Sequence, residues 1–162
     1  MSVFADTSSL YATIVRTEEH HLSCLKVFKD LLEGNRAIRT TNYVVLETAT
    51  LLQHRIGLDP LRDFEEYILP MVSVAWVTKE LHHRGVRRLL RANKRNLSLT
   101  DCVSFEFMEQ EGLREAFSLD RHFAEAGFRL LSRRSHKLEL RKSCRMRESH
   151  GTKIHQGSSY LD

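Results

Sequence analysis

Four acidic residues have side chains suited to holding a metal ion, and they are Asp6, Glu47, Asp101 and Asp120. Asp6 and Asp120 each directly follow a short apolar run, whereas Glu47 and Asp101 fall in the early turns of two expected helices. Four converging carboxylates would repel one another strongly without a cation. Mg²⁺ and Mn²⁺ take carboxylate oxygens as ligands, and one such ion, or two about 4 Å apart, can activate water against a phosphodiester. We therefore expect a metal site for phosphodiester hydrolysis.

Each aspartate also has a simpler local interpretation as a helix cap. Asp6 in DTSSL and Asp120 before RHFAEA stand where an N-cap residue would stand. Asp101 completes an S-x-x-D capping box that begins at Ser98. No single aspartate is therefore evidence for catalysis, and the joint pattern carries the argument.

Glu47 is the most informative of the four acids because its helical neighbours are apolar. Tyr43, Val44 and Leu51 fall on its face of the helix at i−4, i−3 and i+4. A buried carboxylate without a partner is costly, so it should neutralise or find a cation. The alternative to a metal site is a salt bridge with a residue such as Arg55.

The elements that position these acids alternate between short β-like runs and helical patterns. Strands are expected at 2–5, 37–41, 72–77, 116–119 and 128–131. Helices are expected around 22–32, at 43–56 with Asn42 as cap, at 61–68, at 81–92, at 98–112 and at 121–126. This alternation predicts an α/β fold with a mostly parallel sheet covered on both faces. Ligands of such sheets bind beyond the carboxyl ends of the strands, where all four acids are expected. Trp76, inside the third strand, is expected in the core.

Composition indicates one domain followed by a basic tail. A chain of 162 residues with 41% hydrophobic residues suits one globular domain, expected over 1–132. The net charge of +4 comes from residues 132–162, which have a net charge of +5, whereas residues 1–131 have −1. The periodic spacing of apolar residues stops after Leu131, so the segment 133–162 is expected to be a disordered tail. Neither a membrane span nor a secretory signal is apparent. Three widely spaced cysteines, Cys24, Cys102 and Cys144, fit a reducing cytoplasm.

Four stretches of the chain, in order, resemble the motifs of the PIN-domain family, particularly its VapC-like toxin ribonucleases. They are VFADTSSLYA, TTNYVVLETATLL, LSLTDCVSF and AFSLDRHFAEAGFRLL, which together span residues 3–131. The resemblance implies a three-layer α/β/α sandwich with a central sheet of about five parallel strands. It also implies Mg²⁺- or Mn²⁺-dependent cleavage of single-stranded or structured RNA by the four acids. The resemblance favours a homodimer and leaves open whether a cognate antitoxin is a partner.

The resemblance further implies supporting roles for hydroxyl residues. At one position this sequence differs from the family's motif. Thr7 or Ser8 takes the place of the hydroxyl residue that supports the first acid, and Ser118 opens the last motif. That motif often reads T-x-D-x-D-F, but here His122 replaces the second acid. We expect His122 to be an exposed helix residue rather than a ligand.

Two other protein classes also place acids at the edge of an α/β sheet or keep the PIN fold. A phosphoacceptor receiver domain needs an aspartate after the third strand and a lysine after the fifth, but Thr78 and Ser132 stand there. A non-catalytic PIN-fold module that binds RNA or protein remains the alternative. The basic segment from Lys79 to Arg95 is either a solvated helix face or a rim that contacts RNA phosphates.

Overall fold

The structure is a computed structural model that describes residues 2–131. Within these residues, five strands form one parallel sheet in the order β3-β2-β1-β4-β5. The strands are β1 (Val3–Ala5), β2 (Ile38–Thr41), β3 (Val72–Ala75), β4 (Glu115–Phe117) and β5 (Arg129–Leu130). The β1 strand is fully buried at the centre of the sheet, and its neighbours β2 and β4 lie on either side. The expected parallel sheet of about five strands is therefore confirmed.

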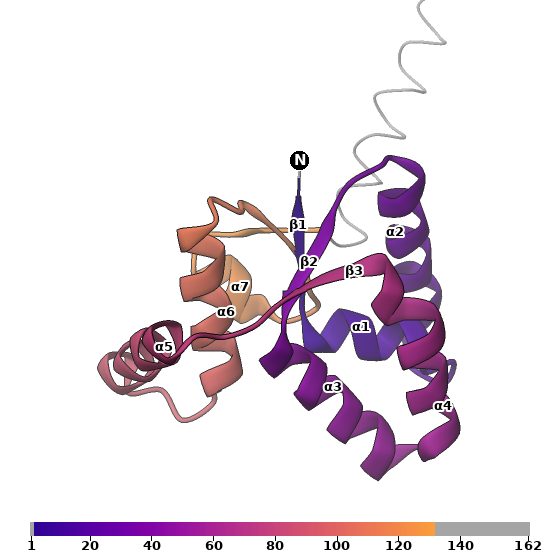
Figure 1. The fold of residues 1–162 in the computed structure, drawn as a ribbon, viewed down its shortest axis with the longest axis horizontal. Helices are drawn as coiled ribbons and strands as arrows, with labels where there is room; N and C mark the ends of the chain where they lie inside the picture. The colour runs from indigo at the N-terminus through magenta and orange to yellow at the C-terminus, as the bar shows by residue number, and fades with distance from the viewer. Residues whose placement is uncertain (1, 132–162) are drawn as a thin grey trace, which may run out of the picture. The chain divides into compact units, whose positions relative to one another are not determined.

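Helices cover both faces of this sheet. They are α1 (Thr7–Ile14), α2 (His21–Glu33), α3 (Asn42–Arg55), α4 (Leu58–Asp63), α5 (Lys79–Ala92), α6 (Leu99–Gln110) and α7 (Arg121–Glu125). Figure 1 shows α1 and α2 on one side of the central strands and α5 and α6 on the other. The expected three-layer sandwich is confirmed. After α4 the chain continues as a π-helical turn, Phe64–Ile68, and a 3₁₀ turn, Leu69–Met71, before it enters β3.

The helices α1 and α3 begin directly after strands of the same sheet, so their N-termini lie at its carboxyl edge. Asp6 follows β1 and caps α1, whereas Thr41 ends β2 and caps α3. The expected cap at Asn42 was wrong, because the Asn42 side chain instead accepts a 2.7 Å hydrogen bond from the backbone N–H of Val77. That bond ties the start of α3 to the segment after β3.

The expectation that Trp76 lies in the core was also wrong. The β3 strand ends at Ala75, and the Trp76 side chain is 80% exposed. Trp76 therefore lies just beyond the end of an edge strand rather than inside the sheet.

Within residues 2–131, no helix combines the length and the apolar character that a membrane-spanning helix requires. Cys24 and Cys102 are buried free thiols. The predicted tail at 133–162 lies outside the described residues.

Candidate active site

All four predicted acids line one depression at the carboxyl edge of the sheet. Its volume is ≈ 350 Å³, and its polar lining consists of Asp6, Thr7, Ser8, Tyr11, Glu18, Glu47, Arg55, Ser98, Asp101 and Asp120. The fold therefore brings the four acids together at one edge of the sheet, as the sequence predicted. The N-termini of the helices that begin here carry partial positive charge, which favours carboxylates near them.

Asp6 is the most deeply buried of the four, with 3% of its surface exposed. One carboxylate oxygen accepts hydrogen bonds from the Ser8 backbone N–H at 3.2 Å, the Ser8 hydroxyl at 2.7 Å and the Ser118 hydroxyl at 2.9 Å. Burial raises the pKa of Asp6 to about 6, the two serines oppose that rise, and Asp101 adds to it. Asp6 is thus a helix cap and a site-lining group at once.

Glu47 projects from α3 into the same depression and is half-buried. The Thr7 hydroxyl donates a 2.7 Å hydrogen bond to its carboxylate. Burial raises the pKa of Glu47, the Thr7 bond lowers it, and the charge of Asp101 raises it. Among the described residues Glu47 makes no ion pair with Arg55, whose guanidinium lies 5.9 Å from the centre of the Tyr11 ring. The alternative of a Glu47–Arg55 salt bridge is therefore not what the structure shows.

Asp101 and Asp120 are held by the starts of two further helices. The Ser98 backbone N–H donates to Asp101 at 2.9 Å, and the Ser98 hydroxyl accepts from the Asp101 N–H at 2.9 Å, which completes the predicted capping box. Asp120 caps α7 and accepts a 2.9 Å bond from the backbone N–H of His122. The cap and the site interpretations are thus compatible at every aspartate, because the cap fixes the carboxylate at the edge of the sheet.

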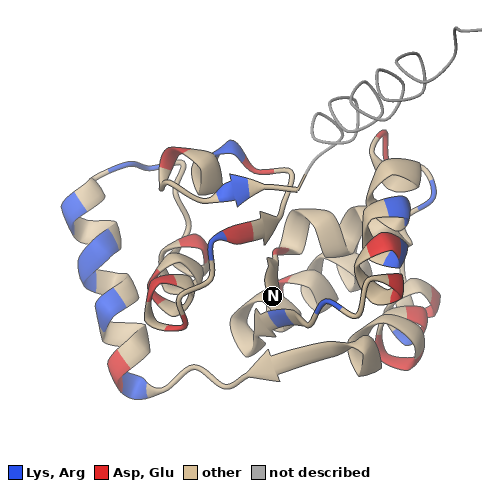
Figure 2. Ribbon diagram, turned by 90° about the horizontal axis from the view of Figure 1, so that it is seen from above, with Lys and Arg blue, Asp and Glu red and all other residues tan. Residues whose placement is uncertain are grey.

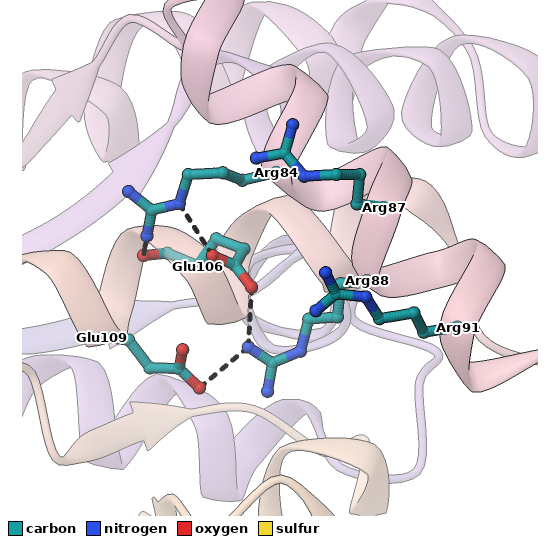
Figure 3. Close-up of a pocket in the computed structure, with 6 residues that line it drawn as sticks. All are labelled: Arg84, Arg87, Arg88, Arg91, Glu106 and Glu109. Atoms are coloured by element: carbon teal, nitrogen blue, oxygen red, sulfur yellow. Dashed lines mark hydrogen bonds and ion pairs between the residues drawn. The ribbon is translucent and has the colours of Figure 1, made fainter.

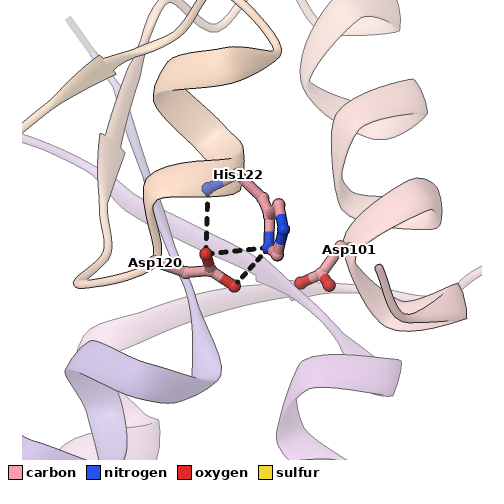
Figure 4. A group of neighbouring side chains, drawn as sticks. All are labelled: Asp101, Asp120 and His122. Atoms are coloured by element: carbon pink, nitrogen blue, oxygen red, sulfur yellow. Dashed lines mark hydrogen bonds and ion pairs between the residues drawn. The ribbon is translucent and has the colours of Figure 1, made fainter. Parts of the chain in front are cut away.

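His122 joins this cluster, contrary to the expectation that it is exposed. Only 11% of its side chain is accessible, and its Nδ1 lies 2.9 Å from an Asp120 carboxylate oxygen. Ligand atoms of Asp101, Asp120 and His122 all lie within 4.8 Å of one another. Figure 4 shows the imidazole turned toward both carboxylates. The substitution in the last motif was the available sequence signal, but the direction of the ring depends on the packing of α7 against α6.

The donor set fits a divalent cation. Oxygens of several carboxylates and hydroxyls, together with one imidazole, are available within one small depression. Burial and the charge of Asp101 both raise the pKa values of Asp6 and Glu47. Without a cation, the ionised forms of these carboxyls are therefore unfavourable. A bound cation relieves this repulsion, so these residues suit a site for Mg²⁺ or a first-row transition ion.

Figure 2 shows Lys and Arg positions along α5. Part of this basic segment lines a separate depression of ≈ 530 Å³ between α5 and α6 (Figure 3). Its lining consists of Arg84, Arg87, Arg88, Arg91, Glu106 and Glu109. Arg84 and Arg88 bind the Glu106 carboxylate at 2.8 and 3.1 Å, respectively, which joins the two helices. These two arginines therefore have a structural role, whereas Arg87 and Arg91 extend from α5 without an ion pair in Figure 3.

The sequence did not identify one charged residue of the acidic depression, Glu18, and it offered Arg55 only as a salt-bridge partner of Glu47. Glu18 lies in the exposed turn between α1 and α2, and Arg55 ends α3. Glu18 belongs to no strand end or motif, so only the spatial arrangement of these helices places it in the depression.

Comparison with known proteins agrees with this geometry. The family model described as PIN domain matches residues 3–129. The 23S rRNA-specific endonuclease VapC20 of Mycobacterium tuberculosis is 33% identical over 92 residues, which is 56% of this chain and 70% of that protein. The crystal structure of that VapC20, described as a sarcin-ricin loop cleaving toxin, matches with a TM-score of 0.69 and 31% identity, covering 78% of this chain and 96% of that one.

Two less similar solved structures share the fold. FitAcB from Neisseria gonorrhoeae matches with a TM-score of 0.58 at 13% identity, covering 79% of this chain and 95% of that one. DNA-bound VapBC from Salmonella typhimurium matches with a TM-score of 0.57 at 16% identity, covering 80% and 97%. The resemblance drawn from the four motifs is thereby confirmed, and the chain belongs to the PIN domain family.

Proposed function

We propose that this protein is a metal-dependent endoribonuclease that uses Mg²⁺ or Mn²⁺ to hydrolyse phosphodiester bonds of RNA. The observation that carries the proposal is the convergence of Asp6, Glu47, Asp101 and Asp120 on one depression. These four carboxylates would hold the ion. A divalent ion bound there supplies a Lewis acid for the phosphodiester and a more acidic water as nucleophile.

The residues around the acids prepare them for this task. Ser8 and Ser118 fix the Asp6 carboxylate, and Thr7 fixes that of Glu47, so each ligand has a defined direction before the ion arrives. Such pre-orientation by neighbouring hydrogen bonds typically contributes 10–100-fold to metal affinity or activity. We therefore assign Thr7, Ser8 and Ser118 as positioning residues.

A structured ribosomal RNA loop is the proposed substrate class. VapC20, which is about one-third identical, is named for cleavage of 23S rRNA and of the sarcin-ricin loop. We accordingly propose that this chain acts as the toxin of a toxin–antitoxin pair in the cytoplasm, with a cognate antitoxin as partner and a homodimer as its assembly.

RNA cleavage by the purified protein tests the proposal. Ribosomes and a synthetic sarcin-ricin stem-loop are incubated with the wild type, Asp101→Asn and the control Asp63→Asn, whose exposed carboxyl lies outside the depression. We expect Mn²⁺-dependent cleavage by the wild type and the control, and at least a hundredfold loss with Asp101→Asn. Full activity of Asp101→Asn would remove the catalytic assignment. A wild type that binds RNA but neither Mn²⁺ nor Mg²⁺ would favour the alternative of a non-catalytic binding module.

A further inference from the structure

The imidazole of His122 is the one nitrogen ligand in the cluster that Asp101 and Asp120 form among the described residues. Its Nδ1 lies 2.9 Å from one Asp120 oxygen and 3.1 Å from the other. In the tautomer that carries its proton on Nδ1, the ring would donate to the Asp120 carboxylate, and in the other tautomer Nδ1 has a free lone pair for a cation. Nδ1 and the Asp120 carboxylate are therefore two neighbouring groups that can both bind a cation through lone pairs.

We propose that His122 Nδ1 is a ligand of the divalent ion and that it biases the site toward a first-row transition ion, such as Mn²⁺, over Mg²⁺. The inference rests on the proposed function insofar as that function places an ion between Asp101 and Asp120. It goes further because it adds a nitrogen to an otherwise oxygen-only set and derives a metal preference from it.

The geometry fits one shared ion. The three ligand atoms lie within 4.8 Å of one another. Ligands on opposite sides of an octahedral ion with bonds of about 2.1 Å are about 4.2 Å apart, and adjacent ones are closer. Small side-chain rotations are therefore enough to bring the three atoms into one coordination sphere.

The ring is also held in the direction that binding requires. Asn96 contacts its Nε2 at 3.2 Å, and the His122 backbone N–H donates to Asp120 at 2.9 Å. The adjacent Phe123 is fully buried, which fixes the start of α7 against the core. With a metal on Nδ1, the neutral imidazole would carry its single proton on Nε2, and a half-turn of the Asn96 carboxamide would present an oxygen to accept it. Metal-binding histidines are typically oriented by a hydrogen-bond acceptor of this kind.

The preference follows from the ligand type. Mg²⁺ takes oxygen ligands and retains several waters, whereas first-row transition ions also bind imidazole. Removal of the nitrogen should therefore weaken Mn²⁺ more than Mg²⁺. Replacement by aspartate should restore an oxygen-only set and reduce the ratio of Mn²⁺ to Mg²⁺ affinity.

Pulsed electron paramagnetic resonance of the Mn²⁺-loaded full-length protein tests the assignment without reference to activity. A directly bound imidazole nitrogen modulates the Mn²⁺ spin echo, and ¹⁵N-labelling of histidine changes that modulation in a defined way. The variants are His122→Ala, His122→Asp and the control His83→Ala, whose exposed side chain belongs to α5. Titration calorimetry gives the Mn²⁺ affinity, and competition gives that of Mg²⁺.

We expect nitrogen modulation in the wild type and in His83→Ala, and none in either His122 variant. His122→Ala should lose roughly tenfold or more in Mn²⁺ affinity. His122→Asp should retain Mn²⁺ binding with a smaller preference over Mg²⁺, so a folding defect in the alanine variant does not decide the question. Mn²⁺ binding without nitrogen modulation in the wild type would overturn the role of His122 and leave the proposed function intact. Absence of Mn²⁺ and Mg²⁺ binding in the wild type would instead overturn the proposed function.

Discussion

The Thr7 hydroxyl donates a 2.7 Å hydrogen bond to the Glu47 carboxylate across 40 positions of sequence. This bond joins the first turn of α1 to α3, and both helices begin at the carboxyl edge of the sheet. It holds the Glu47 carboxylate in the depression, and it opposes the rise that burial causes in the pKa of Glu47. The orientation of Glu47 therefore depends on a residue that follows Asp6 directly.

Thr7→Val should weaken metal binding with little loss of fold. The valine keeps the shape of threonine but removes the donor, at a cost of about 1 kcal/mol in the free energy of unfolding. We expect a several-fold drop in Mn²⁺ affinity, measured by calorimetry. Thr50→Val is the matched control, because the Thr50 hydroxyl bonds only the Leu46 carbonyl on an exposed turn of α3. Equal Mn²⁺ affinities for the two variants would contradict a positioning role for Thr7.

Glu47→Gln should separate metal binding from stability. The change removes the charge at nearly constant volume, so in chelator the free energy of unfolding should hold or rise as repulsion by Asp101 is relieved. Mn²⁺ should stabilise the wild type, and this effect grows as the ion concentration rises above the dissociation constant. The same increase in stability should be smaller in Glu47→Gln. Melting with chelator and with Mn²⁺ measures both quantities. A variant that melts early in chelator but keeps the full Mn²⁺ increment would exclude Glu47 from the site.

Asp6→Asn should change the pH dependence of stability in a defined direction. Burial raises the pKa of Asp6 from 3.8 to about 6 in the folded protein. The folded state therefore binds this proton more tightly than the unfolded state, and the contribution of Asp6 to stability falls as pH rises from about 4 to about 6. Above pH 6 ionised Asp6 destabilises the metal-free fold by on the order of 3 kcal/mol.

Denaturant unfolding in chelator at pH 4, 5, 6 and 7.5 checks this expectation. The stability of Asp6→Asn relative to the wild type should be lowest near pH 4 and should increase up to about pH 6. Asp63→Asn changes an exposed position on α4. The difference between its free energy of unfolding and that of the wild type should be the same at all four pH values. A constant difference between Asp6→Asn and the wild type across this range would show that the raised pKa of Asp6 does not contribute.

Gly85→Ala should destabilise the protein although alanine favours helices. A Cβ at Gly85 would overlap Val103 Cγ2 and would lie 3.1 Å from the Val103 backbone nitrogen, so α5 and α6 would have to separate. Overpacking of this kind typically costs 1–3 kcal/mol. In the Val103→Ala background the nearest atom is absent, and the added cost of Gly85→Ala should be smaller. Chemical denaturation of the four proteins of this cycle measures the coupling, and a stabilised Gly85→Ala would show that the helices move apart freely.

The sequence determined the sheet and the placement of the acids, because both depend on local patterns. Short apolar runs separated by helical periods specify parallel strands, and residues that follow such strands lie at one edge. Asp6 and Asp120 could thus be placed from their neighbours alone. Asp101 was fixed by its capping box with Ser98, and Glu47 by its position on an apolar helix face.

Only the tertiary structure decided which side chains meet. The contact of Thr7 with Glu47, the close approach of Gly85 to Val103 and the inward direction of His122 each join segments that the chain brings together through packing. The exposure of Trp76 likewise depends on where an edge strand leaves the sheet. Periodicity specifies the face of an element on which a residue lies, but side-chain partners and raised pKa values depend on distances between elements, and those are fixed only when the helices pack on the sheet.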